Sequence, residues 1–422
     1  MSIMRRNHDQ VPHSMSQLHR RRLLLAAAAA ALPVAPVSSQ PAKLRIGVLN
    51  DMSGPYKDGA GPTSVLCARQ ALEDFGVAAK GMAVEVLAGD HQNKPDIGAG
   101  IVRQWIDQDG VDCIVDVPNS AVALAVSQVV RDKNKVCLNT SLATNRLTGD
   151  MCSPNTLHWT GDTYMLANST GGALVASGGD NWFLIVADYA LGHQLRQNVA
   201  DLLRKTGGRL AGEAAYPFPV TSDFSAYMVQ AQASGANVLG LANAGGDTQN
   251  CIKQAVEFGL RQQMKIAALL FTINDIHALG LQVAQGLNLT ETFYWDLNDR
   301  TRAFTRRLLP KTPHNYPNME HAGTYAAVLH YLKVAADMGV AQAKADGAAT
   351  VNRMKAMPFD DDCFGSGSIR QDGQVLVTPY VFKVKAPAES NGPWDFYRLI
   401  TSTPPEQAFQ SLADGHCPLV RT

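Results

Sequence analysis

The chain has 422 residues, more than a single hydrophobic core usually serves, so two domains are expected. Its 37 basic residues equal its 37 acidic ones, and this balance argues against the basic surface of a nucleic-acid-binding protein. Hydrophobic residues make up 46% and charged residues 18%, which is typical of a globular protein.

The N-terminus has the order of a secretory signal: three arginines (Arg20–Arg22), an apolar run (Leu23–Leu32) and then small residues. We expect residues 1–39 to be this signal, exported by the Sec or the twin-arginine route, since Arg21 and Arg22 fit the latter loosely. The alternative is an uncleaved tail. The apolar run is shorter than the roughly 20 residues of a membrane span, and no longer one follows, so we expect an exported protein that is not membrane-embedded.

From Lys43 onward, buried strands alternate with amphipathic helices. The first run predicts strands at 43–49, 82–89, 112–117 and 135–140, and helices at 61–75, 95–109 and 120–134. The second run predicts strands at 182–187, 211–217, 237–243 and 265–271, and helices at 161–177, 191–206, 223–234 and 248–258. Strands alternating with helices of about 10–15 residues predict an α/β fold with mostly parallel, doubly wound sheets flanked by helices.

Longer helices follow, at 298–309, 318–338 and 344–357, with two late strands at 367–374 and 378–385. Late elements after two α/β units indicate that the chain returns to lobes already built. We expect lobe 1 to comprise 43–158 and about 290–365, and lobe 2 to comprise 159–289 and about 366–400. Residues 401–422 are expected to form a C-terminal tail packed on the body.

All seven cysteines lie beyond the predicted signal, in a compartment where disulfides persist. Four sit in apolar periodic segments and are expected to be buried thiols, whereas Cys152, Cys363 and Cys417 sit in irregular stretches. A bridge between Cys152 and Cys417 would tie the tail to the body, but the sequence leaves the connectivity open. No cysteine or histidine spacing indicates a metal, and we expect no cofactor.

Ligands of open parallel sheets bind at the carboxyl ends of the strands. Six loops follow such ends and carry hydroxyl, amide or aromatic side chains: 50–56, 117–123, 139–145, 187–193, 242–249 and 271–277. Asn119 and Ser120 occupy the start of a helix, where backbone N–H groups favour a carboxylate, and 141–144 adds hydroxyls. The alternative is plain helix capping.

Tyr56, Trp159 and Tyr189 are aromatic residues at strand ends or at the crossing between lobes, and they suit the wall of a small organic ligand. Packing in the core is the alternative for each. Asn274 and Asp275 either meet a cationic group of the ligand or cap the short helix behind them. No nucleophile, base and carboxylate combination or metal constellation supports an enzyme.

The chain resembles an exported solute-binding protein of the branched-chain amino acid ABC transporter type, a type I periplasmic binding protein. The resemblance covers Lys43 to about Val420 and rests on several stretches in this order: LNDMSGPY (49–56), ALEDFG (71–76), WTGDTYMLAN (159–168), VADYALGHQL (186–195), the 223–247 stretch ending LANAGGD, KQAVEFG (253–259) and ETFYWDLND (291–299). It implies two lobes joined by three crossings, which close on a ligand and present it to an inner-membrane permease.

The resemblance also implies the ligand residues. Asn119, Ser120, the Leu142 backbone and Thr144 match the family's carboxylate site, Tyr189 its aromatic, and Asp275 lies nearest to its ammonium-binding carboxylate. Asn243, in the small LANAGGD loop, is a further candidate. Leu191 stands at an often aromatic position, and relatives with such pockets resemble binders of aromatic acids.

The function implied is therefore the periplasmic component of an ABC importer that binds a small organic carboxylate, either an amino acid or an aromatic acid. We expect a monomer. The alternative function is a binding protein of the same fold that reports the ligand to a membrane receptor.

Overall fold

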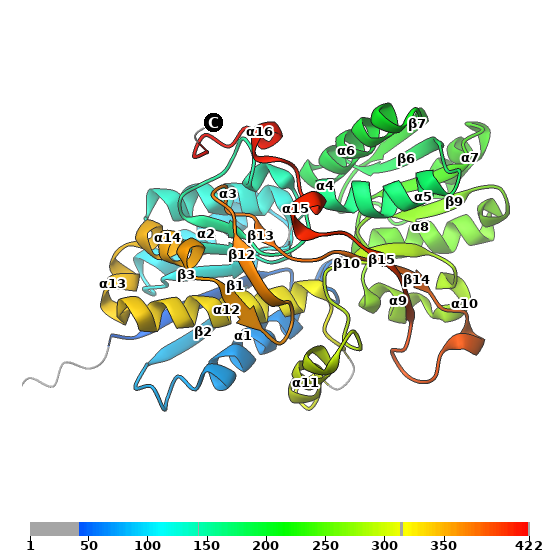
Figure 1. Ribbon diagram of the computed structural model, residues 1–422. Helices are drawn as coiled ribbons and strands as arrows, with labels where there is room; N and C mark the ends of the chain where they lie inside the picture. The colour runs from blue at the N-terminus through cyan, green and yellow to red at the C-terminus, as the bar shows by residue number, and fades with distance from the viewer. Residues whose placement is uncertain (1–41, 142, 313–314, 421–422) are drawn as a thin grey trace, which may run out of the picture. The chain divides into compact units, whose positions relative to one another are not determined.

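The computed structural model describes residues 42–141, 143–312 and 315–420; the expected signal sequence and Leu142 lie outside them. The first run of strands and helices builds a five-stranded, wholly parallel sheet in the order β2-β1-β3-β4-β5 (Figure 1). Its strands are β1 (Leu44–Asn50), β2 (Val84–Asp90), β3 (Cys113–Asp116), β4 (Val136–Asn139) and β5 (Thr156–His158). The helices between the first four strands are α1 (Gly61–Phe75), α2 (Pro95–Asp107) and α3 (Ser120–Asp132).

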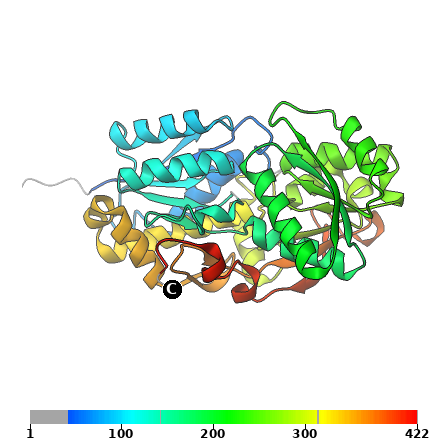
Figure 2. The same ribbon diagram turned by 90° about the horizontal axis from the view of Figure 1, so that it is seen from above.

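Helices cover both faces of this sheet because successive residues of a strand point to opposite faces (Figure 2). Ile46 and Val48 of β1 pack with residues of α1, and Leu49 packs with residues of α2 and α3. Gly47 leaves room for the Trp105 ring of α2, two atoms of which would lie 2.5 Å from a Cβ at that position. The missing side chain is therefore what lets α2 approach the strand.

The second run builds a seven-stranded sheet in the order β15-β14-β10-β9-β8-β6-β7. Strands β6 to β10 run parallel, and β14 and β15 add an antiparallel edge. The strands are β6 (Asn181–Ala187), β7 (Arg209–Tyr216), β8 (Val238–Ala242), β9 (Lys265–Ala268), β10 (Asn288–Glu291), β14 (Tyr380–Val384) and β15 (Tyr397–Ser402). The helices of this region are α4 (Thr163–Leu166), α5 (Gly172–Ala176), α6 (Ala190–Thr206), α7 (Ser225–Ala233), α8 (Gly245–Glu257), α9 (Ile273–Leu279) and α10 (Leu281–Ala284).

The chain passes between the two sheets three times: after β5, after β10 and before β14. After β10 come α11 (Asp299–Leu308) and α12 (Met319–Met338), which packs along α1. A small sheet of β11 (Phe359–Asp361), β12 (Gly365–Ile369) and β13 (Val375–Leu376) precedes the last crossing. The late return expected from the sequence is thus present.

Strand pairing bears on the proposed lobe boundaries, which stay a proposal. Residues 365–376 lie beside the first sheet, because Gln374 bridges to His158 of β5. β14 and β15 join the second sheet, as does β10. We therefore draw the late segment of lobe 2 from 380 to 402 instead of 366 to 400, and begin that of lobe 1 after 291.

The expected helix at 344–357 is two helices, α13 (Val340–Ala345) and α14 (Gly347–Ala356). Asp346 between them caps α14 by accepting a hydrogen bond from the Ala349 N–H at 3.0 Å. A Cβ on Gly347 would lie 2.5 Å from the backbone of Lys135. The helix is therefore interrupted where it contacts the residue before β4. This contact between distant segments cannot be read from the local pattern.

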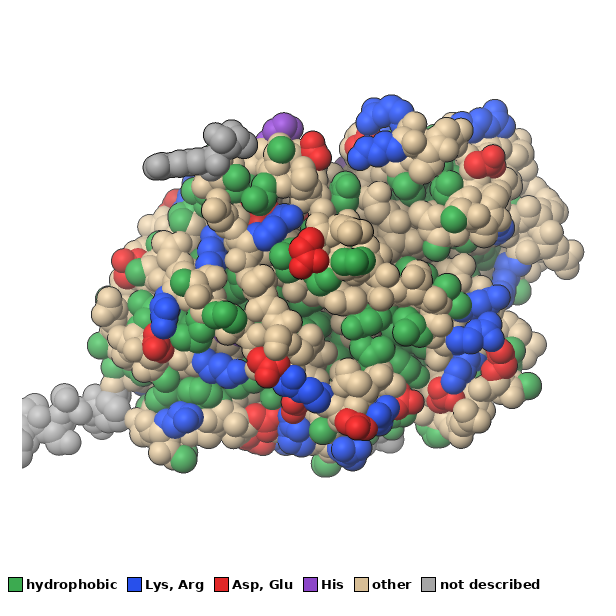
Figure 3. Space-filling view, in the orientation of Figure 1, with side chains coloured by type: hydrophobic (Ala, Val, Ile, Leu, Met, Phe, Trp, Pro, Cys, Tyr) green, Lys and Arg blue, Asp and Glu red, His purple; other side chains and the backbone are tan. Residues whose placement is uncertain are grey.

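The C-terminal helices α15 (Pro405–Ala408) and α16 (Leu412–Gly415) follow the second sheet. A disulfide joins Cys152 and Cys417, whose Cα atoms are 5.6 Å apart, and the other five cysteines are buried thiols. On the face shown in Figure 3, basic and acidic side chains are interspersed, as the balanced composition suggests. Over residues 42–141, 143–312 and 315–420, no helix is long and apolar enough to cross a bilayer.

Candidate functional site

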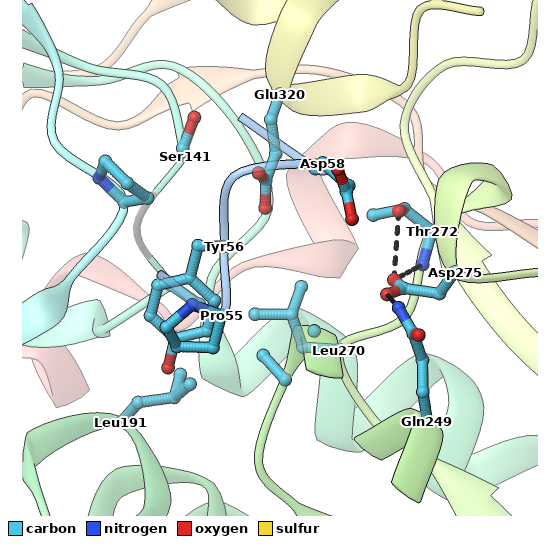
Figure 4. Close-up of a pocket in the computed structure, with 15 residues that line it drawn as sticks. Pro55, Tyr56, Asp58, Ser141, Leu191, Gln249, Leu270, Thr272, Asp275 and Glu320 are labelled. Atoms are coloured by element: carbon cyan, nitrogen blue, oxygen red, sulfur yellow. Dashed lines mark hydrogen bonds between the residues drawn. The ribbon is translucent and has the colours of Figure 1, made fainter. Parts of the chain in front are cut away.

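A cavity lies where loops at the carboxyl ends of strands from both sheets meet α12. The space between its lining atoms is about 500 Å³, counting the part open to solvent. The lining residues are Pro55, Tyr56, Asp58, Gly59, Pro118, Ser141, Ala143, Leu191, Ala244, Gly245, Gln249, Leu270, Thr272, Asp275 and Glu320 (Figure 4). The position follows the rule for open parallel sheets.

The loop after β1 is held rigidly by a buried carboxylate. Asp51 accepts hydrogen bonds from the N–H groups of Gly54, at 2.7 Å, and Tyr56, at 2.9 Å. It also accepts from the Asn93 side-chain amide at 2.8 Å. A Cβ on Gly54 would lie 2.7 Å from both Asp51 oxygens, so glycine is required there. The polar residues of this loop therefore serve to fix the position of Tyr56.

Three aromatic rings form one wall next to the cavity. The Tyr56 hydroxyl is 2.5 Å from that of Tyr189, at the start of α6. Phe218 stacks on both rings, with centroid distances of 5.8 Å to Tyr56 and 4.4 Å to Tyr189. Burial, followed by the neighbouring Tyr189, raises the pKa of Tyr56, so its hydroxyl stays protonated at neutral pH. The wall joins loops of the two sheets.

The start of α8 touches the loop after β1 at backbone level. Gly245 has a φ of +57°, and a Cβ there would overlap the Pro55 carbonyl oxygen and lie 3.1 Å from the Tyr56 ring. The Gly246 N–H donates a hydrogen bond to that same carbonyl at 3.3 Å. Glycine at 245 therefore permits both the left-handed conformation and the close approach.

The opposite side of the cavity is acidic. Asp58, Asp275 and Glu320 line it, and no lysine or arginine is among the described lining residues. Asp275 is already engaged, because it accepts from Gln249 at 2.8 Å and from the Thr272 N–H and hydroxyl at 2.9 and 3.0 Å. The last two contacts belong to a capping box at the start of α9. The capping role that the sequence left open is thus present.

Glu320 differs from Asp275. It belongs to the first turn of α12 and is 8% exposed, yet within the described part of the chain its carboxylate has no hydrogen bond or ion pair. Figure 4 shows that carboxylate pointing into the cavity above Tyr56, next to Asp58. Burial, with Asp116, Asp275 and Glu291 nearby, raises its pKa well above the ordinary value. The site therefore holds a carboxyl group with free hydrogen-bonding capacity.

A further buried carboxylate, Asp116, lies beneath the Ser141 edge. Asp116 accepts hydrogen bonds from the side chains of Asn50, Ser141 and Thr140, the last at 3.3 Å. Burial raises its pKa to about 6 despite these donors. The network ties the ends of β1, β3 and β4 together and explains the polar residues at those strand ends.

The expected carboxylate site is only partly assembled at the cavity. Ser141 and Ala143 flank Leu142 and line it, whereas Asn119, Ser120 and Thr144 do not. Asn119 caps α3, accepting from the N–H groups of Ala121 and Val122 at 2.9 and 3.1 Å. The Thr144 hydroxyl accepts from the Arg146 N–H at 3.4 Å. The Ser120 hydroxyl is buried without a hydrogen-bond partner among the described residues, so it retains a free donor.

Three other candidates make structural contacts. Asn243 accepts from the Thr248 hydroxyl at 2.6 Å, next to the start of α8. Asn274 accepts from the Asn318 amide at 2.7 Å and donates to the Tyr316 carbonyl at 2.9 Å, which links α9 to the segment before α12. Trp159 is fully buried against Phe359, with a centroid distance of 5.4 Å. None of them lines the cavity.

Sequence reasoning missed Glu320, Asp58 and Gln249. Glu320 follows Asn318, which caps α12, so its acidic side chain looks like an ordinary helix-dipole partner in the sequence. Phe218 was also missed, because it lies in a loop after β7 that carries no motif. Within the described ranges, no group of three or more His, Cys, Asp or Glu could hold a metal ion.

Comparison with known proteins shows the family of the chain. A family model described as periplasmic binding protein matches residues 43–392. A periplasmic binding protein from Burkholderia mallei is 42% identical, with a TM-score of 0.86 over 90% of this chain and 99% of the other. A branched-chain amino acid ABC transporter periplasmic ligand-binding protein from Burkholderia xenovorans LB400 is 35% identical, with a TM-score of 0.78 over 89% and 99%.

A solute binding protein of an ABC transporter from R. palustris, solved in complex with 4-hydroxybenzoate, shares the fold at 19% identity. Its TM-score is 0.76 over 86% of this chain and 97% of the other. No curated protein matches the chain. The fold and family are those of two-lobed solute-binding proteins and not of enzymes. The family match and the two relatives above 30% identity lead to one conclusion: this chain belongs to the periplasmic binding proteins.

Proposed function

We propose that this protein is the periplasmic component of an ABC importer, which captures a small organic carboxylate between its lobes and delivers it to a membrane permease. The observation that carries the proposal is the cavity itself, whose lining comes from loops of both sheets and from α12. A ligand there would touch both lobes at once, so its binding energy would favour their closure. The predicted signal at 1–39 supports export to the periplasm.

An amino acid fits the described lining better than an aromatic acid does. An ammonium group would face the carboxylates on the acidic side, and a ring or aliphatic chain would face Tyr56, Leu191 and Leu270. The carboxylate of the ligand would meet the Ser141–Ala143 edge, with the free Ser120 hydroxyl nearby as a donor. Aromatic acids remain the second class to test, since a relative of the same fold is described in complex with 4-hydroxybenzoate.

The test is a thermal-shift screen of the purified protein, freed of co-purified ligand by unfolding and refolding. The panel holds Leu, Ile, Val and Phe, together with benzoate, 4-hydroxybenzoate, short dicarboxylates and simple amides. A ligand at 100 times its Kd stabilises the folded protein by about 2.7 kcal/mol, enough to raise the Tm by a few degrees. If no compound of the panel raises the Tm, the result would count against the importer proposal.

Tyr56→Ala tests whether this cavity is the binding site. We expect the variant to fold and to lose most of the ligand-induced shift, because the ring lines the cavity and bonds to Tyr189. Tyr164→Ala is the matched control, since Tyr164 is partly buried on α4 and does not line the cavity. An equal ligand-induced Tm shift in the wild type and in Tyr56→Ala would mean that the ligand binds outside this cavity.

A further inference from the structure

The two buried carboxylates on the acidic side of the cavity differ in their hydrogen bonding. Asp275 accepts three hydrogen bonds from Gln249 and Thr272, whereas Glu320 accepts none among the described residues. A buried carboxylate without a partner costs free energy, and protonation only partly removes that cost. Glu320 is therefore the group whose free-energy cost of burial would fall most when a hydrogen-bond donor enters the cavity.

The surroundings of Glu320 define the donor. From β3, α9 and β10 it faces Asp116, Asp275 and Glu291, and Asp58 lies beside it at the rim. On its own helix, burial lowers the pKa of His321 to about 4, so that ring is neutral at pH 7. No basic side chain among the described lining residues offsets these carboxyl groups. A neutral donor would give Glu320 a hydrogen bond but leave the negative charge of these groups unbalanced, and an anionic group would add to that charge, whereas a cation would both donate hydrogen bonds and offset the charge.

We propose that Glu320 is the counter-ion for a positively charged amine on the ligand, and that the natural solute therefore carries such an amine. The inference rests on the proposed solute-binding function and names the substrate class of the same site. Asp275 keeps its capping role at α9, so the ammonium lies on the α12 side of the cavity and not on the α9 side. The acidic rim at Asp58 would attract the amine as it enters.

Binding should then release a proton. Burial and the neighbouring carboxyls raise the pKa of free Glu320 well above its ordinary value, and an incoming alkylammonium, which pairs with the ionised form, lowers it again. The ligand keeps its charge and the protons that Glu320 loses pass to the buffer, so ligand binding should release protons across the pH range in which free Glu320 titrates. A residue that only supported the fold would not produce this release.

The experiment is titration calorimetry with two matched sets of probes, again on the refolded protein. One set is L-leucine, 3-methylbutylamine and 4-methylpentanoate, and the other is L-phenylalanine, 2-phenylethylamine and 3-phenylpropanoate. Each set keeps the side chain and removes first the carboxylate and then the amine. We expect the amine-free acid to bind at least 10-fold more weakly than the amino acid.

Variants assign the effect to Glu320. Glu320→Gln should weaken binding of the amine-bearing probes by about 10- to 150-fold, the range of a charge-assisted hydrogen bond. It should also abolish proton release, measured from heats in phosphate and Tris, whose ionisation enthalpies differ. Asp275→Asn is the matched control and should cost less affinity and leave the proton release in place.

The outcomes separate the two proposals. Binding of only the amine-free acids or benzoates would overturn the amine inference and leave the solute-binding function standing. A larger loss in Asp275→Asn than in Glu320→Gln, or proton release that persists in Glu320→Gln, would also overturn it. If no probe binds, and mass spectrometry of the protein as first purified detects no small organic molecule, both the solute-binding function and the amine inference would be refuted.

Discussion

The contact between Gly245 and Pro55 gives a sharp prediction, because the neighbouring Gly246 provides its control. In Gly245→Ala, the new methyl group would overlap the Pro55 carbonyl oxygen and press on the Tyr56 ring. The loop cannot yield locally, since Asp51 holds the Gly54 and Tyr56 N–H groups. The two segments must therefore move apart.

The magnitude follows from what that movement breaks. The Gly246 N–H bond to Pro55 and the hydroxyl contact between Tyr56 and Tyr189 contribute about 1 kcal/mol each, and the stacking on Phe218 contributes up to about 1 more. We expect these contacts to form as the lobes close on the ligand, so a loss of about 2–3 kcal/mol there should weaken affinity by about 30- to 150-fold. The left-handed backbone adds a folding cost of about 1 kcal/mol.

The assay is calorimetric titration of the best-binding compound of the screen, with thermal unfolding measured in parallel. In Gly246→Ala a Cβ would meet nothing within 4 Å, so its affinity should stay within about twofold of wild type, since no contact is disturbed. Equal affinity of the Gly245 and Gly246 variants would refute the argument that this contact accompanies binding. A loss of stability without a loss of affinity would refute it as well.

Three further predictions concern stability. Burial raises the pKa of Asp247 to about 6, so the folded state holds its proton more tightly and the protein loses stability as the pH rises from about 4 to about 6. Asp247→Asn should flatten that part of the pH profile by at most about 3 kcal/mol in urea unfolding, and an unchanged profile would contradict the assignment. Replacing Cys152 and Cys417 together with Ser opens a loop with a sequence separation of 265 residues, for which chain entropy gives about 5–6 kcal/mol. Calorimetry should show a lower Tm that a reductant no longer changes, and a Tm equal to that of the wild type would mean that the disulfide does not stabilise the fold. Trp159→Phe should reduce stability by about 1–3 kcal/mol by leaving space in the core, with no change in affinity, because Trp159 does not line the cavity; a specific loss of affinity would place it in the site.

The sequence by itself determined the elements that depend on local pattern. The alternation of apolar strands with helices gave the two mostly parallel sheets, and the late helices and strands indicated the return of the chain. Strand ends are visible in sequence, so the loop carrying Tyr56 and the one carrying Asp275 could be expected at one cavity. The division of 344–357 at Asp346 could not be expected, because it depends on contact with Lys135, distant in the chain.

The tertiary structure decided which polar groups at those strand ends are free. Asn119, Asn274 and Asp275 all look available in sequence, but caps and contacts between distant segments use their hydrogen-bonding capacity. Glu320 looks like an ordinary acidic residue in a first helical turn, and only the packing of α12 against the loops leaves it buried and without a partner among the described residues. Local pattern fixes the residue types that reach the cavity, whereas the balance of donors and acceptors depends on neighbours far apart in the chain and is settled only on folding.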